Sequence, residues 1–151
     1  MPDKGIAAAG ARVPLVGWDG GDAIGEAGGL LHVSGQLPFR DGQVITGRLG
    51  DGTSLEDGQA AAQACALMVV AQIKAAIGGL ERVTRIVKLG VFVNSVADFT
   101  DQPKVANGAS DLMVALFGDA GRHARAAVGV AALPLGAAVE VDAIVEVAPA
   151  L

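Results

Sequence analysis

The sequence has few aromatic residues, a single cysteine and fewer basic than acidic residues, and each shortage argues against one class of site or partner. Aromatic residues make up 3% of the 151 positions and do not interleave with basic residues as a stacking surface for single-stranded nucleic acid requires. The 11 lysines and arginines are outnumbered by 16 acidic residues, which leaves a net charge of -5. Binding through phosphates requires clustered basic side chains. We therefore expect no nucleic-acid partner.

Cysteine and histidine are too scarce for a disulfide framework or a metal centre. Cys65 cannot form an intramolecular disulfide, and its place in an alanine-rich helical pattern predicts a small buried thiol without a role. His32 and His123 are the only histidines, and neither has Cys, Asp or Glu at metal-ligand spacing. The chain also lacks a nucleophile elbow, a phosphate loop and a dinucleotide fingerprint. We expect neither a metal nor a cofactor.

A chain of this length is one domain, large enough to bury a core without disulfides or metal. We predict a single domain over residues 1–151, in which residues 1–14 are a poorly packed N-terminal extension. The apolar run 6–10 is too short and too interrupted for a secretory segment or a membrane span, so we expect a cytoplasmic protein without a membrane partner. Because 52% of the residues are hydrophobic and 18% charged, we also expect self-association.

Alternation, capping residues and turns predict an α+β fold. Ser54 suits the cap of a long helix, and the glycine pair 78–79 suits its left-handed end. We expect strands at 30–36, 44–45, 83–93, 124–131 and 138–147, helices at 54–77 and from 101–103 to 117, and a loop at 17–29. This order implies a sheet with both helices on one face and nothing covering the other face in a monomer.

One arginine stands in a run of small residues near the C-terminus. Strand alternation puts Arg125, Ala127, Gly129 and Ala131 on one face, so the guanidinium is surrounded by side chains too small to cover it. That arrangement leaves space for a planar anion.

The last two predicted strands are joined by a short turn, which suggests an antiparallel hairpin. A regular hairpin places Ala127 or Gly129 opposite Glu140 and brings Glu140 close to Arg125. A cation that binds carboxylates and an acid that exchanges protons with water would then share one patch. The alternative is an ordinary cross-strand ion pair on a wet sheet face, and hairpin spacing alone favours it.

A second candidate is the segment 34–36, at the end of a buried strand. Gly35 would let a ligand approach the backbone there, beside the hydroxyl of Ser34. The alternative is a bulge or a turn, which is the commoner reason for a glycine at a strand end.

Taken together, the segments 33–38 (VSGQLP), 91–94 (VFVN), 124–125 (AR), 133–134 (LP) and 139–144 (VEVDAI) resemble the RidA/YjgF family of imine and enamine deaminases. This family is also labelled endoribonuclease L-PSP, and the chain is most similar to a longer YjgF-like branch. The resemblance implies a chorismate-mutase-like fold with a mixed sheet, and a homotrimer whose sheets surround a central barrel. It also implies a ligand cleft between each pair of subunits.

The resemblance also assigns roles to residues. In the family the strand arginine, here Arg125, holds the carboxylate of a 2-imino or 2-enamino acid, and the glutamate associated with the hydrolytic water falls on Glu140. Ser34 and Gly35 match the Ser-Gly of the cleft wall, and Asn107 matches an asparagine on the second helix. The implied reaction adds water to the imine carbon and releases ammonia and a 2-oxo acid without a cofactor.

The chain departs from the family pattern at three points. It has no tyrosine before the Ser-Gly strand, Ala127 stands where family deaminases commonly have cysteine, and Gly129 replaces a common polar residue. Carboxylate binding is therefore better supported than turnover, and the small Ala127 suits a larger substrate. Three hypotheses follow, in this order: a deaminase of imino acids, a binding module for a small carboxylate or other metabolite, and an endoribonuclease or translation inhibitor, which the acidic composition disfavours.

Overall fold

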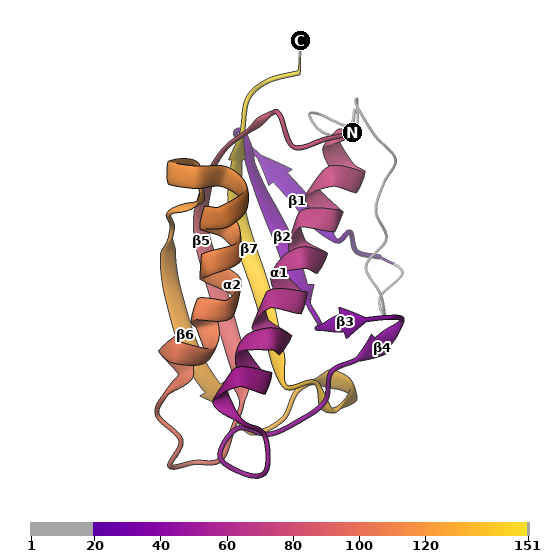
Figure 1. Ribbon diagram of the computed structural model, residues 1–151. Helices are drawn as coiled ribbons and strands as arrows, with labels where there is room; N and C mark the ends of the chain where they lie inside the picture. Colours follow the sequence, from indigo (N-terminus) through magenta and orange to yellow (C-terminus); the bar gives the residue numbers. More distant parts are fainter. Residues whose placement is uncertain (1–19, 151) are drawn as a thin grey trace.

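Two helices pack side by side on one face of a five-stranded sheet in the computed structural model, which describes residues 20–150 (Figure 1). The predicted N-terminal extension, residues 1–14, lies outside the described residues. The elements are β1 (Ile24–Ala27), β2 (Leu30–Gln36), β3 (Phe39–Arg40), β4 (Gln43–Val44), α1 (Leu55–Ile77), β5 (Val83–Asn94), α2 (Gln102–Phe117), the 3-10 turn η2 (Gly118–Gly121), β6 (Ala124–Val130), the 3-10 turn η3 (Pro134–Gly136) and β7 (Val139–Val147). The mixed α+β architecture predicted from the sequence is confirmed.

Helix α1 begins and ends where the sequence predicted. The hydroxyl of Ser54 accepts a hydrogen bond of 3.1 Å from the backbone of Asp57, and Gly78 ends the helix with a left-handed φ of 81°. The helix is long and apolar enough to cross a membrane, yet its apolar stripe is buried in the core. It is therefore a core helix. The predicted stripe is fully or nearly buried: Ala62, Cys65, Ala66, Val69, Ile73 and Ile77.

The predicted hairpin between the last two strands is wrong. The order in the sheet is β1-β2-β7-β5-β6, so β7 lies between β2 and β5, and β6 forms the edge beside β5. Strand β6 runs parallel to β5 because α2 carries the chain back along the sheet between them. Strand β7 is antiparallel to both of its neighbours.

Burial explains why β7 takes the central place. Alternate residues of β7 are valine or alanine and are buried against the helices. The strand therefore buries the most apolar surface where it has a neighbouring strand on both sides. Strand β6 is rich in alanine and glycine and is largely exposed. Because its side chains are small, it gives up the least buried apolar surface at an edge of the sheet. The connection through η3 is long enough to pass the end of β5.

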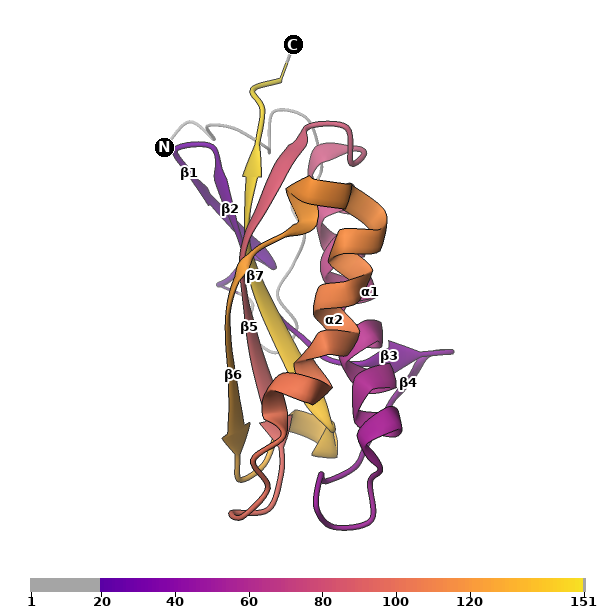
Figure 2. The same cartoon turned by 60° about the vertical axis from the view of Figure 1, so that its left-hand side comes forward.

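The described part of the predicted loop 17–29 contains a strand. Strand β1 pairs with β2 through a tight turn in which Gly28 and Gly29 have φ values of 61° and 82°. Paired glycines allow the positive φ that such hairpin turns require. The predicted short strand at 44–45 is found as β4, which pairs with β3. Both helices cover the same face of the large sheet, as predicted (Figure 2). No element within residues 20–150 covers the other face, which we call the bare face.

Candidate functional site

Arg125 lies on the edge strand β6 and points toward the helix side of the sheet. It is opposite Leu89 of β5, which is opposite Ala143 of β7, and both of these neighbours are buried under the helices. Its Nη1 atom donates hydrogen bonds to Oδ1 of Asn107 at 2.9 Å and to Oγ of Ser110 at 3.1 Å. Helix α2 therefore holds the guanidinium through two neutral acceptors.

The rest of the guanidinium remains available to a ligand. An arginine side chain has five N–H donors, and Arg125 uses two of them, both from Nη1. Within residues 20–150, no carboxylate lies within ion-pair distance of it. A hollow of about 250 Å³ beside it is lined by Ser110, Val114, Arg122, His123 and Arg125. The helix side of β6 thus offers an accessible cation with free donors.

The small residues that follow Arg125 share its face, as predicted. Ala127 is half-buried. Gly129 lies so close to the end of β5 and the start of α2 that an added Cβ would be 2.6 Å from the hydroxyl of Ser95 and 2.8 Å from Nε2 of Gln102. A second hollow of about 320 Å³ opens at this end of β6. Close packing therefore requires a glycine at position 129, and the hollow lies beside it.

Glu140 lies on the opposite face of the sheet. It is opposite Phe92 of β5, one register position away from the helix-facing pair of Val91 and Val141. Its carboxyl group packs against Gly35, because a Cβ added at Gly35 would lie 2.8 Å from Cδ of Glu140. The expectation that Glu140 lies beside Arg125 is therefore wrong within one chain. Both residues alternate correctly along their strands, but the strands are not hairpin partners.

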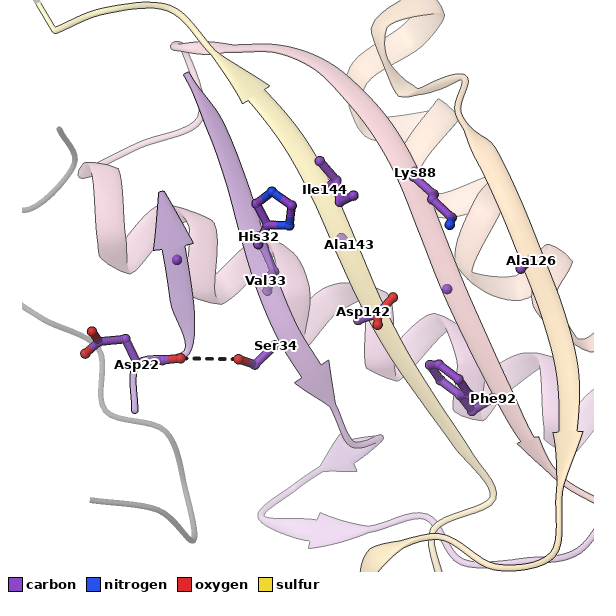
Figure 3. Close-up of a pocket in the computed structure, with 12 residues that line it drawn as sticks. Asp22, His32, Val33, Ser34, Lys88, Phe92, Ala126, Asp142, Ala143 and Ile144 are labelled. Atoms are coloured by element: carbon purple, nitrogen blue, oxygen red, sulfur yellow. Dashed lines mark hydrogen bonds between the residues drawn. The ribbon is translucent and has the colours of Figure 1, made fainter. Parts of the chain in front are cut away.

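The bare face of the sheet carries a shallow hollow of about 500 Å³ (Figure 3). His32 and Ser34 of β2, Lys88 and Phe92 of β5 and Asp142 of β7 line it. The hydroxyl of Ser34 is engaged, since it donates to the backbone carbonyl of Asp22 at 3.2 Å (Figure 3). This face combines apolar and charged side chains, and none of the described elements covers it.

The predicted site residues thus form two groups. Arg125, Asn107 and Ala127 lie on the helix side of the sheet, and Glu140 and Gly35 lie together on the bare side, with Ser34 preceding Gly35. Asn107 contacts Arg125 directly, as a shared site requires.

Two residues that bear on Arg125 were missed from the sequence. Ser110 follows Asn107 by three residues on α2, and helical residues three apart share a face. His123 precedes Arg125 by two residues, and alternate residues of an extended chain share a face. Those two spacings could have identified both residues.

Burial raises the pKa of Glu140, and the negative charge of Asp142 adds to the effect. A raised pKa means that the folded protein favours the protonated carboxyl, so this contribution to stability is present at low pH and is lost as the pH rises through the raised pKa. We expect Glu140→Gln to be more stable than the wild type at pH 7, with a difference that disappears below the ordinary value of 4.5. Thermal melts at pH 7 and pH 4 measure this.

The matched control is Glu146→Gln, on the same face of β7 but exposed. The amide oxygen that this substitution introduces can still accept the hydrogen bond that Glu146 Oε1 accepts from the Thr84 hydroxyl. The melting temperature of Glu146→Gln should therefore equal that of the wild type at both pH values. An equal loss of stability in Glu140→Gln at pH 7 and pH 4 would contradict the assigned cause.

The described residues offer neither a reactive thiol nor a cluster of metal-binding side chains. Burial also raises the pKa of Cys65, whose thiol donates to the carbonyl of Val139 at 3.4 Å inside the core. Within residues 20–150, no group of three or more His, Cys, Asp or Glu side chains is placed to hold a metal ion.

Residues 4–147 match the family model described as "YjgF/chorismate_mutase-like, putative endoribonuclease". The chain belongs to the YjgF family. The family resemblance inferred from the strand motifs is thereby confirmed. Protein TCP17 of Trypanosoma cruzi is 63% identical over 122 residues, which cover 80% of this chain and 76% of that protein.

Solved structures of this family share the fold of the chain. Atu1372 from Agrobacterium tumefaciens, a protein of unknown function, is 44% identical and superposes with a TM-score of 0.83, covering 94% of this chain and 88% of that one. A Shewanella oneidensis protein described as a "putative endoribonuclease" is 33% identical with a TM-score of 0.82, covering 94% of this chain and 96% of that one. These likenesses establish the YjgF fold and leave the reaction open.

Proposed function

We propose that the chain is a cofactor-free hydrolase that converts reactive 2-imino and 2-enamino acids into 2-oxo acids and ammonia. The proposal rests on the free hydrogen-bond donors of Arg125. Its guanidinium is held by two neutral acceptors and keeps donors free at the edge of a hollow. A carboxylate bound there would form charge-assisted hydrogen bonds without displacing an internal ion pair.

The reaction needs little more than orientation and proton transfer. With the carboxylate on Arg125, water adds to the imine carbon and one of its protons passes to the nitrogen, which gives a carbinolamine. The carbinolamine hydroxyl then passes its proton to the nitrogen as the C–N bond breaks, which leaves a 2-oxo acid and ammonia. A 2-enamino acid first tautomerises to the imine by taking up a proton at C3 and losing one from nitrogen. Burial and the nearby charge of Asp142 raise the pKa of Glu140, which suits a group that exchanges protons with water. Gly35 leaves the Glu140 carboxyl accessible, and Ser34 precedes it on the same wall.

A joint site requires more than one chain. Because Arg125 and Glu140 lie on opposite faces of one sheet, a single chain does not bring them together. A homotrimer with a cleft between neighbouring subunits would place the Arg125 edge of one copy against the Glu140 face of the next. The bare sheet face would then be covered by assembly. We expect this trimer to act in the cytoplasm without a membrane or nucleic-acid partner.

The direct test supplies imines made in place by an amino-acid oxidase and follows their disappearance with and without the chain. We expect the wild-type protein to accelerate hydrolysis over buffer, because it orients the substrate and polarises the imine. Light scattering on the same sample should give three times the 15.0 kDa of one chain. If no imine is hydrolysed faster than in buffer, the chain is not a deaminase.

A binding module is the second candidate, favoured by the inert Ala127 two residues after Arg125. In that case calorimetry detects binding of 2-oxo acids that depends on Arg125, and the protein does not accelerate imine hydrolysis over the rate in buffer alone. RNA cleavage, which the family description names, is the third candidate. Degradation of RNA by a nuclease-free preparation would support it.

A further inference from the structure

The side chain of His123 lies between a backbone carbonyl and the hydroxyl of Ser110. Nδ1 is 2.6 Å from the carbonyl oxygen of Gly121, and Nε2 is 2.8 Å from Oγ of Ser110. Gly121, in η2, is buried and packs closely against α2, because an added Cβ would lie 2.6 Å from the backbone carbonyl carbon of Met113. This packing fixes the position of the Gly121 carbonyl. The imidazole is therefore held in one orientation.

The two hydrogen bonds determine which nitrogen carries the proton. A carbonyl oxygen only accepts, so Nδ1 must donate to Gly121 and is protonated in every charge state of the ring. In the neutral ring Nε2 is then an acceptor, and the Ser110 hydroxyl donates its one hydrogen to it. Ser110 Oγ meanwhile accepts from Nη1 of Arg125 at 3.1 Å. With neutral His123, Ser110 has no hydrogen left for a ligand.

Protonation of His123 reverses the role of Ser110. Nε2 then carries a hydrogen and donates it to Oγ, which already accepts from Arg125. A hydroxyl has two acceptor sites and one donor, so both acceptor sites are filled and the hydrogen is released. That hydrogen is next to the guanidinium and is available to an oxygen of a bound carboxylate.

The charges around His123 favour this change when an anion binds. Arg122 and Arg125 line the same hollow, and α2 contributes the uncharged Ser110 and Val114. Strand β5 presents the buried Leu89 beside Arg125. Within the described chain, no carboxylate lines this hollow. A bound anion therefore introduces a negative charge among the cations, and that charge favours the protonated imidazole.

We propose that Ser110 and His123 form a proton-linked pair that couples carboxylate binding at Arg125 to the uptake of one proton by His123. The inference rests on the proposed role of Arg125 as the carboxylate anchor and adds a donor to it. Ser110 is a contact to the ligand, and His123 is a positioning residue that sets the direction of the Ser110 hydroxyl. The pair is not arranged for nucleophilic attack, because the hydrogen bond from Arg125 draws electron density from Oγ.

The test is calorimetry of pyruvate binding at pH 7 in two amine buffers that differ in enthalpy of ionisation, at one chloride concentration, so that no carboxylate or phosphate buffer competes. The difference between the two heats gives the number of protons taken up. We expect net proton uptake by the wild type, and an affinity for pyruvate that falls as the pH rises from 6 to 8.

The variants separate this linkage from a structural role. Ser110→Ala should bind pyruvate several-fold more weakly and lose most of the proton uptake, and His123→Gln should bind independently of pH from 6 to 8. Lys74→Gln, which removes an exposed charge from the last turn of α1, is the control and should behave as the wild type. The pH dependence of the wild type tests the linkage even if a variant fails to fold.

The outcomes distinguish the two proposals. Pyruvate binding by the wild type without proton uptake, or full uptake by folded Ser110→Ala, overturns the proton-linked pair. Absence of pyruvate binding overturns both the pair and the carboxylate anchor. Binding with proton uptake but without imine hydrolysis supports the pair and overturns the deaminase.

Discussion

Replacing Arg125 with alanine is expected to weaken pyruvate binding by about ten- to a hundredfold, the range for losing charge-assisted hydrogen bonds to a carboxylate. The same variant should remove most of the acceleration of imine hydrolysis, because the substrate is no longer held by its carboxylate. Stability should change little, since the side chain is exposed and its two acceptors, Asn107 and Ser110, can bind water instead. Calorimetry and the oxidase-coupled assay measure the two effects.

Two further variants identify the cause of that loss. Arg125→Lys keeps the charge but cannot bind a carboxylate with two parallel donors, so it should restore only part of the affinity. Arg85→Ala removes an equal charge from an exposed position on β5 and should bind pyruvate as the wild type does. Equal weakening by Arg85→Ala would mean that net charge, and not the Arg125 site, attracts the ligand.

Replacing Gly108 with alanine is expected to destabilise the fold by about 1–3 kcal/mol, the usual cost of overpacking a tight contact. In an open helix the same change would stabilise the protein by about 1 kcal/mol, because alanine is the better helix former. Here a Cβ at Gly108 would collide with the backbone carbonyl of Gln59, where α1 and α2 pack closely. Backbone atoms cannot rotate away as a side chain does, so the helices must separate. Urea titration of both proteins measures the difference.

Gly58→Ala is the matched control, since Gly58 is also a helical glycine at this helix pair. Its Cβ would meet the end of the Leu49 side chain at 3.0 Å, which can shift by a few tenths of an ångström. We therefore expect it to be close to neutral. A Gly108→Ala protein as stable as the wild type would show that the helix contact is not as close as the structure has it.

The Gly108 variant also reports on the site. Helix α2 carries Asn107 and Ser110, the two acceptors that hold Arg125. Separation of the helices should therefore weaken pyruvate binding as well as stability, although Gly108 itself contacts no ligand.

Much of the local structure followed from sequence because its causes are local. The cap at Ser54, the left-handed end at Gly78 and the buried stripe of α1 depend on residues within a few positions of one another. The shared face of Arg125 and Ala127 depends on strand alternation alone. Each of these predictions is confirmed.

Strand pairing was not predictable in the same way. The short link between β6 and β7 suggested a hairpin, but the apolar residues of β7 are best buried in the middle of the sheet, between strands that are distant in sequence. That competition is decided by the whole core. The error carried over directly to the site, because the hairpin was the reason for placing Glu140 beside Arg125.

By itself, therefore, the sequence determined the fold class, the family, the limits of the helices and the presence of an uncovered arginine, because periodicity, capping and motif order are properties of neighbouring residues. Only the tertiary structure decided that Arg125 and Glu140 lie on opposite faces of the sheet, and that Ser110, His123 and Arg125 form one hydrogen-bonded group. Those contacts join a helix and an edge strand, whose distance depends on the packing of the entire core and not on any local pattern.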